Sequence, residues 1–171
     1  MISEREKKIL LTAYKEIYKT EFVPHQHGEK LKMHKAIYLL KELGTVCGDF
    51  NFFWHISGPY SHNLHKNLLE IESRCSVDEI HEYSNGCVFT AKAEDAIKKL
   101  RDIFSEAEKY GYNSMDWCEV LGSIHFIKKH KCSYENSDEK VIEILEHEKP
   151  NLGNHSSNLQ ALKLLKESSF L

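Results

Sequence analysis

Hydrophobic positions recur every three to four residues over most of the chain, which is the spacing of one buried helix face. Leu64, Leu68 and Ile71 form one such stripe, and Leu100, Ile103 and Phe104 belong to another. The pattern predicts six or seven helices, at 3–22, 31–43, 61–73, 91–110, 115–130, 138–147 and 156–167.

The strongest strand signal lies between the second and third of these helices. Aromatic and β-branched residues, which suit a half-buried pleated surface, crowd into seven positions here: Phe50, Phe52, Phe53, Trp54 and Ile56. Period-two geometry places Trp54 and Ile56 on one face with Phe52, and Phe53 with His55 on the other. Pro59 lacks an amide donor and so ends the strand at Gly58-Pro59, and Ser61 is suited to cap the next helix.

In two more runs, 77–83 and 87–90, apolar and polar residues alternate. These runs flank Ser84-Asn85-Gly86. Because Asn-Gly favours tight two-residue turns, we expect a β-hairpin here, followed by a helix capped by Thr90. The order helix, strand, helix, hairpin, helix is typical of a winged-helix domain. We therefore predict a mainly α, α+β fold whose small sheet comprises the aromatic strand and this hairpin, in a single domain with a winged-helix-like core (1–110) and a C-terminal helical part (111–171) packed on it.

Composition narrows the possible roles. Hydrophobic residues make up 41% of the chain and charged residues 29%, with a net charge of −3, so no overall attraction to nucleic acid or anionic membrane is expected. No apolar run reaches membrane-spanning length, and the N-terminal residues lack the features of a signal peptide. The five cysteines are scattered without a CxxC pair, which favours reduced thiols and a cytoplasmic location.

The chain contains no catalytic constellation, and we expect neither enzymatic activity nor a cofactor. His25 and His27 could share a metal ion, but zinc needs three or four ligands and no further ligand set lies nearby in sequence. Cys118 and His125 lie on one helical face, but seven residues of helix separate them by about 10 Å, too far for a direct hydrogen bond.

The helix KMHKAIYLLKEL, the aromatic strand and the segment HISGPYSHNL resemble the YwgA-like bacterial proteins, which are distantly similar to the Panacea (SocA-like antitoxin) domain. The stretch LEHEKPNLGNHSSNLQALKLLKESSFL is similar to the end of YwgA-like chains, so the resemblance runs from Leu31 to the C-terminus. Tyr60-Ser61 after the Gly-Pro pair departs from Panacea proteins, where an aliphatic residue follows. The resemblance implies a small cytosolic bacterial or phage protein that binds and neutralises, or tethers, a partner protein.

Our first hypothesis is therefore a non-enzymatic interaction module whose partner is another protein, such as a toxin or a defence or host factor. An exposed aromatic residue would anchor such a contact. An equally open alternative is that Trp54 belongs to the core and Gly58-Pro59 is only a rigid turn. The candidate surface consists of Trp54, His55, Gly58, Pro59, Tyr60, Ser61, His62 and His65.

The alternative function is DNA binding by a winged-helix regulator, with the helix at 61–73 in the major groove. Lys66, Asn67 and Arg74 would contact bases or phosphates. Acidic residues on that helix and on the expected wing argue against DNA binding, because carboxylates repel the phosphate backbone.

Overall fold

The computed structural model describes residues 1–45, 47–132 and 137–171. Within these ranges the chain forms eight α-helices and one two-stranded antiparallel sheet, which confirms the mainly α, α+β class with one helix more than expected. The helices are α1 (Glu4–Tyr18), α2 (Glu29–Glu42), α3 (His62–Arg74), α4 (Val77–Tyr83), α5 (Ala91–Phe104), α6 (Ser114–Phe126), α7 (Asp138–Glu148) and α8 (His155–Glu167).

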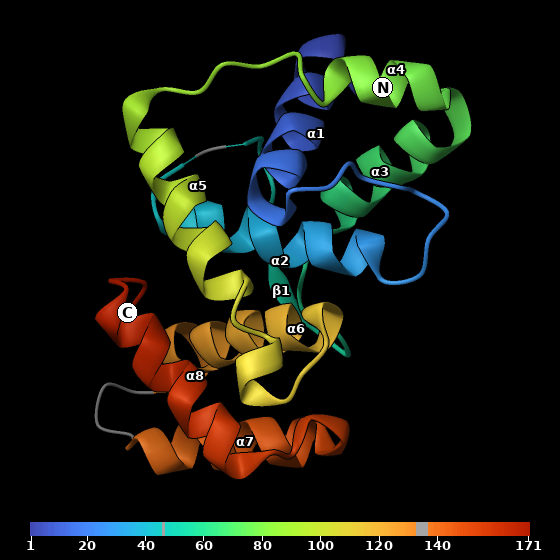
Figure 1. Ribbon diagram of the computed structural model, residues 1–171. Coiled ribbons are helices and arrows are strands. Elements are labelled where there is room, and N and C mark those ends of the chain that lie inside the picture. The colour runs from blue at the N-terminus through green and yellow to red at the C-terminus, as the bar shows by residue number, and fades with distance from the viewer. Residues whose placement is uncertain (46, 133–136) are drawn as a thin grey trace.

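The helices pack in two tiers around α2. In Figure 1, α1 to α5 occupy the upper part of the molecule and α6 to α8 the lower part, with the small sheet between α2 and α6. Helix α2 packs on α6, α1 on α5, and α6 on α8. One continuous cluster of buried hydrophobic residues runs through both tiers, from Ile2 to Phe170. Among the described residues, no helix is both long and apolar enough to cross a membrane.

Local capping signals define most helix starts. The side chain of Ser3 accepts the Glu6 amide and the Glu6 side chain accepts the Ser3 amide, a complete capping box. Ser61 and Thr90 cap α3 and α5 as predicted. Helix α6 begins after Asn113 instead of Ser114, because the Asn113 side chain accepts the Asp116 amide at 2.8 Å.

Two helix ends also differ from expectation. Helix α5 stops at Phe104, and a separate 3₁₀ turn follows at Glu108–Tyr110. Helix α6 stops at Phe126 and continues as a π-helical turn at Ile127–Lys131. The 3.6-residue pattern crosses both junctions, so hydrophobic spacing could not reveal the breaks.

The hairpin predicted between Val77 and Thr90, and with it the wing, is wrong. Residues 77–83 form α4, capped by the Ser76 side chain, and its Ile80 is buried in the core. Cys87 to Thr90 form no regular secondary structure. Asn85 ends the helix instead of forming a turn, since its side-chain nitrogen donates to the His81 carbonyl. A helix cap and a tertiary contact therefore override the local Asn-Gly signal.

The aromatic segment makes its own hairpin. Strand β1 (Phe53–His55) pairs antiparallel with β2 (Gly58–Tyr60), with Trp54 opposite Pro59. Strand β2 contacts α2 and α6, which leaves β1 as the outer strand. Ile56, expected on the same face as Trp54, lies in the turn and is 84% exposed.

We predict that acid destabilises this fold through His125. Its ring is fully buried, Nδ1 accepts a hydrogen bond from the Tyr38 hydroxyl at 2.8 Å, and Nε2 donates to the Phe170 carbonyl at 2.9 Å. Burial lowers the pKa of His125 from 6.5 to about 4, so the unfolded chain binds an extra proton between these values. The free energy of unfolding should fall as pH drops through this window, by about 3 kcal/mol for this group.

Urea unfolding at pH 7, 5.5 and 4 would measure this effect. The variant His125→Gln, which retains a donor and an acceptor, should show a shallower dependence on pH over this window. His27→Gln is the matched control for replacing a histidine by glutamine, because His27 is exposed. Identical pH dependence in the wild type and in His125→Gln would contradict the assignment.

Candidate functional site

The ring of Tyr60 lies at the centre of a group of aromatic and histidine side chains from α2, the hairpin and α3. The ring of His34 stacks on it with a centroid distance of 4.4 Å and an interplanar angle of 14°, and the ring of His55 stacks at 4.5 Å and 23°. We call the whole group the Tyr60 cluster: His34, Phe53, His55, Tyr60, His62 and His65.

Three further rings complete the cluster. Phe53 and His62 meet the Tyr60 ring edge-on, with centroid distances of 5.7 and 5.5 Å. Aromatic pairs prefer these edge-to-face and offset-stacked geometries. Phe53, His55 and His62 are exposed, so one side of the cluster faces solvent. His65 is half-buried beside Tyr60, at 5.5 Å between ring centroids.

His34 forms the buried floor of the cluster. Its side chain is 2% exposed, and Nδ1 accepts the Ser61 amide at 3.3 Å. Burial lowers the pKa of His34 to about 2, so the ring is neutral and carries its proton on Nε2. That nitrogen has no hydrogen-bond partner among the described residues, and in this tautomer it cannot ligate a metal. No group of three or more His, Cys, Asp or Glu within those residues is arranged to hold a metal ion.

The solvent side of the cluster keeps polar groups available. Burial raises the pKa of the Tyr60 hydroxyl, and this hydroxyl makes no hydrogen bond within the described ranges. Burial is also the main cause that lowers the pKa of His65, followed by the positive charge of Lys30, while Glu72 acts in the opposite direction. The Tyr60 hydroxyl and the His65 imidazole can therefore donate or accept hydrogen bonds at the surface of the cluster.

Buried lysines hold the hairpin that carries the cluster. Lys35, on α2 and 1% exposed, donates to the Pro59 carbonyl at 2.8 Å. Lys149, 3% exposed, donates to the Ile56 carbonyl and pairs with Glu119 at 3.1 Å. Such contacts satisfy backbone acceptors that a two-stranded sheet leaves unpaired.

A third lysine supports the approach to the hairpin, because Lys41 Nζ donates to the Phe50 carbonyl at 2.6 Å. Space for Lys35 depends on a glycine, since a Cβ on Gly122 would lie 3.1 Å from Lys35 Cδ. Burial lowers the pKa of Lys35 to about 8, while Cys118 and Glu119 act in the opposite direction. The hairpin is thus ordered by contacts from α2, α6 and the end of α7.

The structure brings together four of the residues predicted for partner binding, namely His55, Tyr60, His62 and His65. Trp54 lies on the other face of β1, half-buried, with its ring 5.7 Å from that of Phe126. Gly58, Pro59 and Ser61 are buried and frame the site. The alternation along the strand places Phe53 on the same face as His55, but the predicted partner surface omits Phe53, Ile56 and His34.

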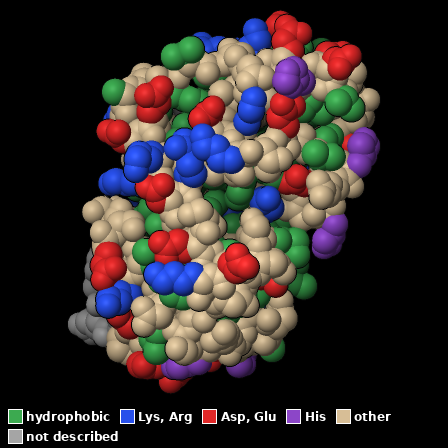
Figure 2. All heavy atoms as spheres, viewed as in Figure 1, with side chains coloured by type: hydrophobic (Ala, Val, Ile, Leu, Met, Phe, Trp, Pro, Cys, Tyr) green, Lys and Arg blue, Asp and Glu red, His purple; other side chains and the backbone are tan. Residues whose placement is uncertain are grey.

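The residues of the DNA-binding alternative lie along α3. Lys66 and Arg74 are exposed and Asn67 is half-buried, but α4 replaces the wing and exposes its acidic residues, Asp78, Glu79 and Glu82. Figure 2 shows acidic and basic side chains interspersed over the face in view, which therefore lacks the continuous basic surface typical of DNA binders.

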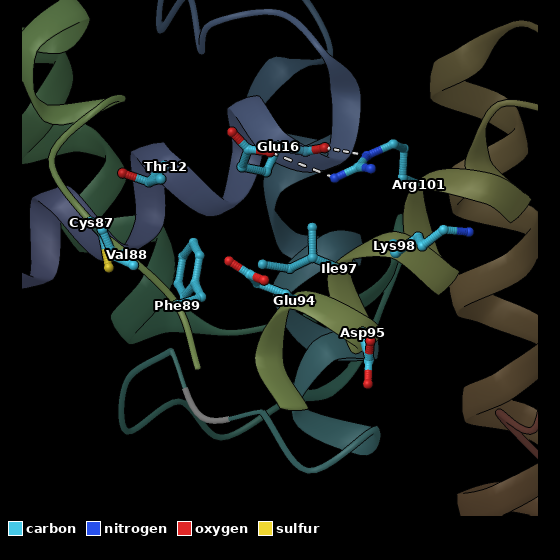
Figure 3. A pocket seen from close by; sticks show the side chains of 10 residues that line it. All are labelled: Thr12, Glu16, Cys87, Val88, Phe89, Glu94, Asp95, Ile97, Lys98 and Arg101. Atoms are coloured by element: carbon cyan, nitrogen blue, oxygen red, sulfur yellow. Dashed lines mark hydrogen bonds and ion pairs between the residues drawn. The ribbon is translucent and has the colours of Figure 1, made fainter. Parts of the chain in front are cut away.

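A cavity of about 420 Å³ lies between α1, α5 and the segment at 87–89, as Figure 3 shows. Its polar groups are largely engaged internally. Arg101 donates to the Glu16 carbonyl at 2.7 Å and pairs with the Glu16 carboxylate at 3.6 Å. Thr12 donates to the Tyr83 carbonyl at 2.9 Å. This arrangement offers no activated nucleophile.

Comparison with known proteins yields no relative: no family model, no curated protein and no solved structure matches the chain.

The substitution Gly58→Ala should destabilise the protein. Gly58 has φ +86°, and a Cβ there would lie 2.5 Å from Ser123 Oγ. The backbone conformation alone should cost about 1–3 kcal/mol for a non-glycine residue. Gly111→Ala is the matched control, because Gly111 has φ +76° but a Cβ there would lie 3.7 Å from Asn154 Nδ2, an ordinary contact distance.

Chemical denaturation of both variants would separate strain from steric overlap. Gly58→Ala should lose more free energy of unfolding than Gly111→Ala, and adding Ser123→Ala to Gly58→Ala should recover part of the difference. Equal losses at the two glycines would show that the approach of Ser123 has no energetic consequence.

Proposed function

We propose that the protein is a non-enzymatic interaction module that binds a partner protein through the solvent side of the Tyr60 cluster and the adjoining hairpin turn. The observation that carries this proposal is a firmly anchored hairpin that exposes large apolar side chains. Ile56 is 84% exposed and Phe53 is 36% exposed. Aromatic and apolar anchors at the centre of a contact supply much of the binding energy in protein interfaces.

Preorganisation supports the same proposal. The backbone of the hairpin is hydrogen-bonded to Lys35 and Lys149 before any partner arrives, so binding need not order it. The Tyr60 hydroxyl and the imidazoles beside it supply hydrogen-bonding groups around the apolar anchors. This combination suits a protein partner, because exposed apolar side chains and hydrogen-bonding groups lie side by side at the hairpin.

The resemblance to YwgA-like and Panacea proteins supports a more specific form of this proposal. In that form the protein is antitoxin-like or associated with defence or phage, and it neutralises or tethers a toxin, a defence protein or a host factor. The five free cysteines fit a reducing compartment, and the cytoplasm is the proposed location.

DNA binding by α3 remains the second candidate, carried by the exposed Lys66 and Arg74. It has weaker support, because α4 places acidic side chains where a wing would contact phosphate. If α3 bound duplex DNA, affinity would fall steeply with salt.

Affinity capture from the native host, with and without nuclease, tests the main proposal. A stoichiometric protein should remain bound after nuclease treatment. Phe53→Asp and Ile56→Asp should each weaken its affinity at least tenfold, because each places a charge in the apolar centre of the contact. Val77→Asp is the matched control, since Val77 on α4 is 83% exposed, close to the value for Ile56.

Undiminished capture by Ile56→Asp and Phe53→Asp would contradict the placement of the surface. Retention of nucleic acid that is lost with nuclease or salt, and weakened by Lys66→Gln, would instead favour DNA binding by α3.

A further inference from the structure

The outer edge of β1, the long side that does not face β2, has backbone groups that the hairpin itself does not use. No further strand lies beside it among the described residues. Trp54 is opposite Pro59 in the hairpin, but proline has no amide, and the Pro59 carbonyl accepts Lys35 from α2 at 2.8 Å. Opposite residues of an antiparallel pair exchange either both hydrogen bonds or none, so the amide and carbonyl of Trp54 point away from β2.

The same alternation extends into the segment before β1. Backbone groups two residues apart share an orientation, so those of Phe52 point outward with those of Trp54. Lysines occupy the carbonyls at both ends of this stretch: the Phe50 carbonyl accepts Lys41 at 2.6 Å, and the Ile56 carbonyl accepts a buried lysine. Between these ends, the amides and carbonyls of Phe52 and Trp54 have no partner of their own within the described ranges. An unpaired edge of this kind can accept an extended segment of another chain.

Positive charge accompanies these open backbone groups. Lys131 Nζ lies 4.4 Å from the centroid of the Trp54 ring, and Lys41 Nζ lies 6.0 Å from that of the Phe52 ring. Lys41 forms no ion pair with the described residues, and the ion pair of Lys131 with Glu148 is long, at 3.8 Å. Each residue of the open edge therefore lies beside an ammonium group, in a chain whose net charge is −3.

We propose that the outer edge of β1 pairs with an extended segment of the partner protein in which apolar and acidic residues alternate. This inference rests on the proposed function and specifies its binding mode. The side chains of an added strand alternate between the two faces of the sheet. Its apolar residues pack on the face that carries the exposed Phe53, and its acidic residues lie on the opposite face, beside Lys131.

The charge also favours a different protein over a second copy of this chain. Pairing of two β1 edges would bring Lys131 of one copy close to Lys131 of the other, and like charges across a strand pair are destabilising. An acidic segment instead meets complementary charge.

Titration of the full chain with a short capped peptide of alternating valine and glutamate, followed by amide NMR shifts, tests the proposal. The Phe52 and Trp54 amides should shift with saturation, and a peptide of alternating valine and lysine should bind at least tenfold more weakly. Lys131→Met should weaken binding of the glutamate peptide. Lys140→Met is the matched control, because Lys140 also pairs with a glutamate of α7, Glu143, and it should leave the affinity unchanged.

N-methylated peptides separate backbone pairing from side-chain contact. Alternate amides of an added strand point toward β1, so methylation of one alternate set should abolish binding, and methylation of the other set should leave it unchanged. Trp54→Pro removes the outward amide, and proline is tolerated at such edge positions. It should bind the peptide at least tenfold more weakly than the matched control Trp54→Val, which loses the ring but keeps the amide.

Failure of the valine–glutamate peptide to bind, or equal binding of the two methylated forms, would overturn strand addition. Shifts of the Phe52 and Trp54 amides that depend on protein concentration without peptide would overturn it in favour of pairing between copies. If strand addition fails while Phe53→Asp still weakens partner capture, the proposed function stands with another binding mode. Peptide pairing together with capture that Phe53→Asp leaves undiminished would instead refute the proposed surface and retain the strand edge.

Discussion

The hydrogen bond from Lys35 to the Pro59 carbonyl is the contact on which the candidate site depends. An ammonium group at a 1% exposed position is costly unless acceptors surround it. The Pro59 carbonyl lies at 2.8 Å, and the negative charge of Glu119 further favours the charged form of Lys35. Glu119 also pairs with Lys149, so α2, α6, the end of α7 and the hairpin are held by one connected polar network.

This network explains how a very short sheet can present a functional surface. Two strands of three residues are marginally stable by themselves in water. Here the backbone of the hairpin is held from below, so its outer side chains are free to form the Tyr60 cluster. Helix α2 supports the cluster through His34, which stacks on Tyr60, and through Lys35, which donates to the Pro59 carbonyl.

The sequence by itself determined the elements whose signals are local. Ser3, Ser61, Thr90 and Ser137 cap helices as their side chains suggest, because a cap requires only the amides two or three residues away. Hydrophobic spacing located seven of the eight helices. The eighth, α4, was missed because its short alternating run and the Asn85-Gly86 pair match a hairpin equally well, and packing of Ile80 into the core decided for the helix.

The site was decided by tertiary structure. From the sequence, Gly58-Pro59-Tyr60 could be placed only as a turn, yet it forms the strand that pairs with Phe53–His55. Its backbone is held by side chains distant in sequence, including Lys149, 93 positions from Ile56. The stacking of His34, Tyr60 and His55 likewise joins three elements. No periodicity encodes such contacts, because they exist only once the core has brought α2, the hairpin and α7 together.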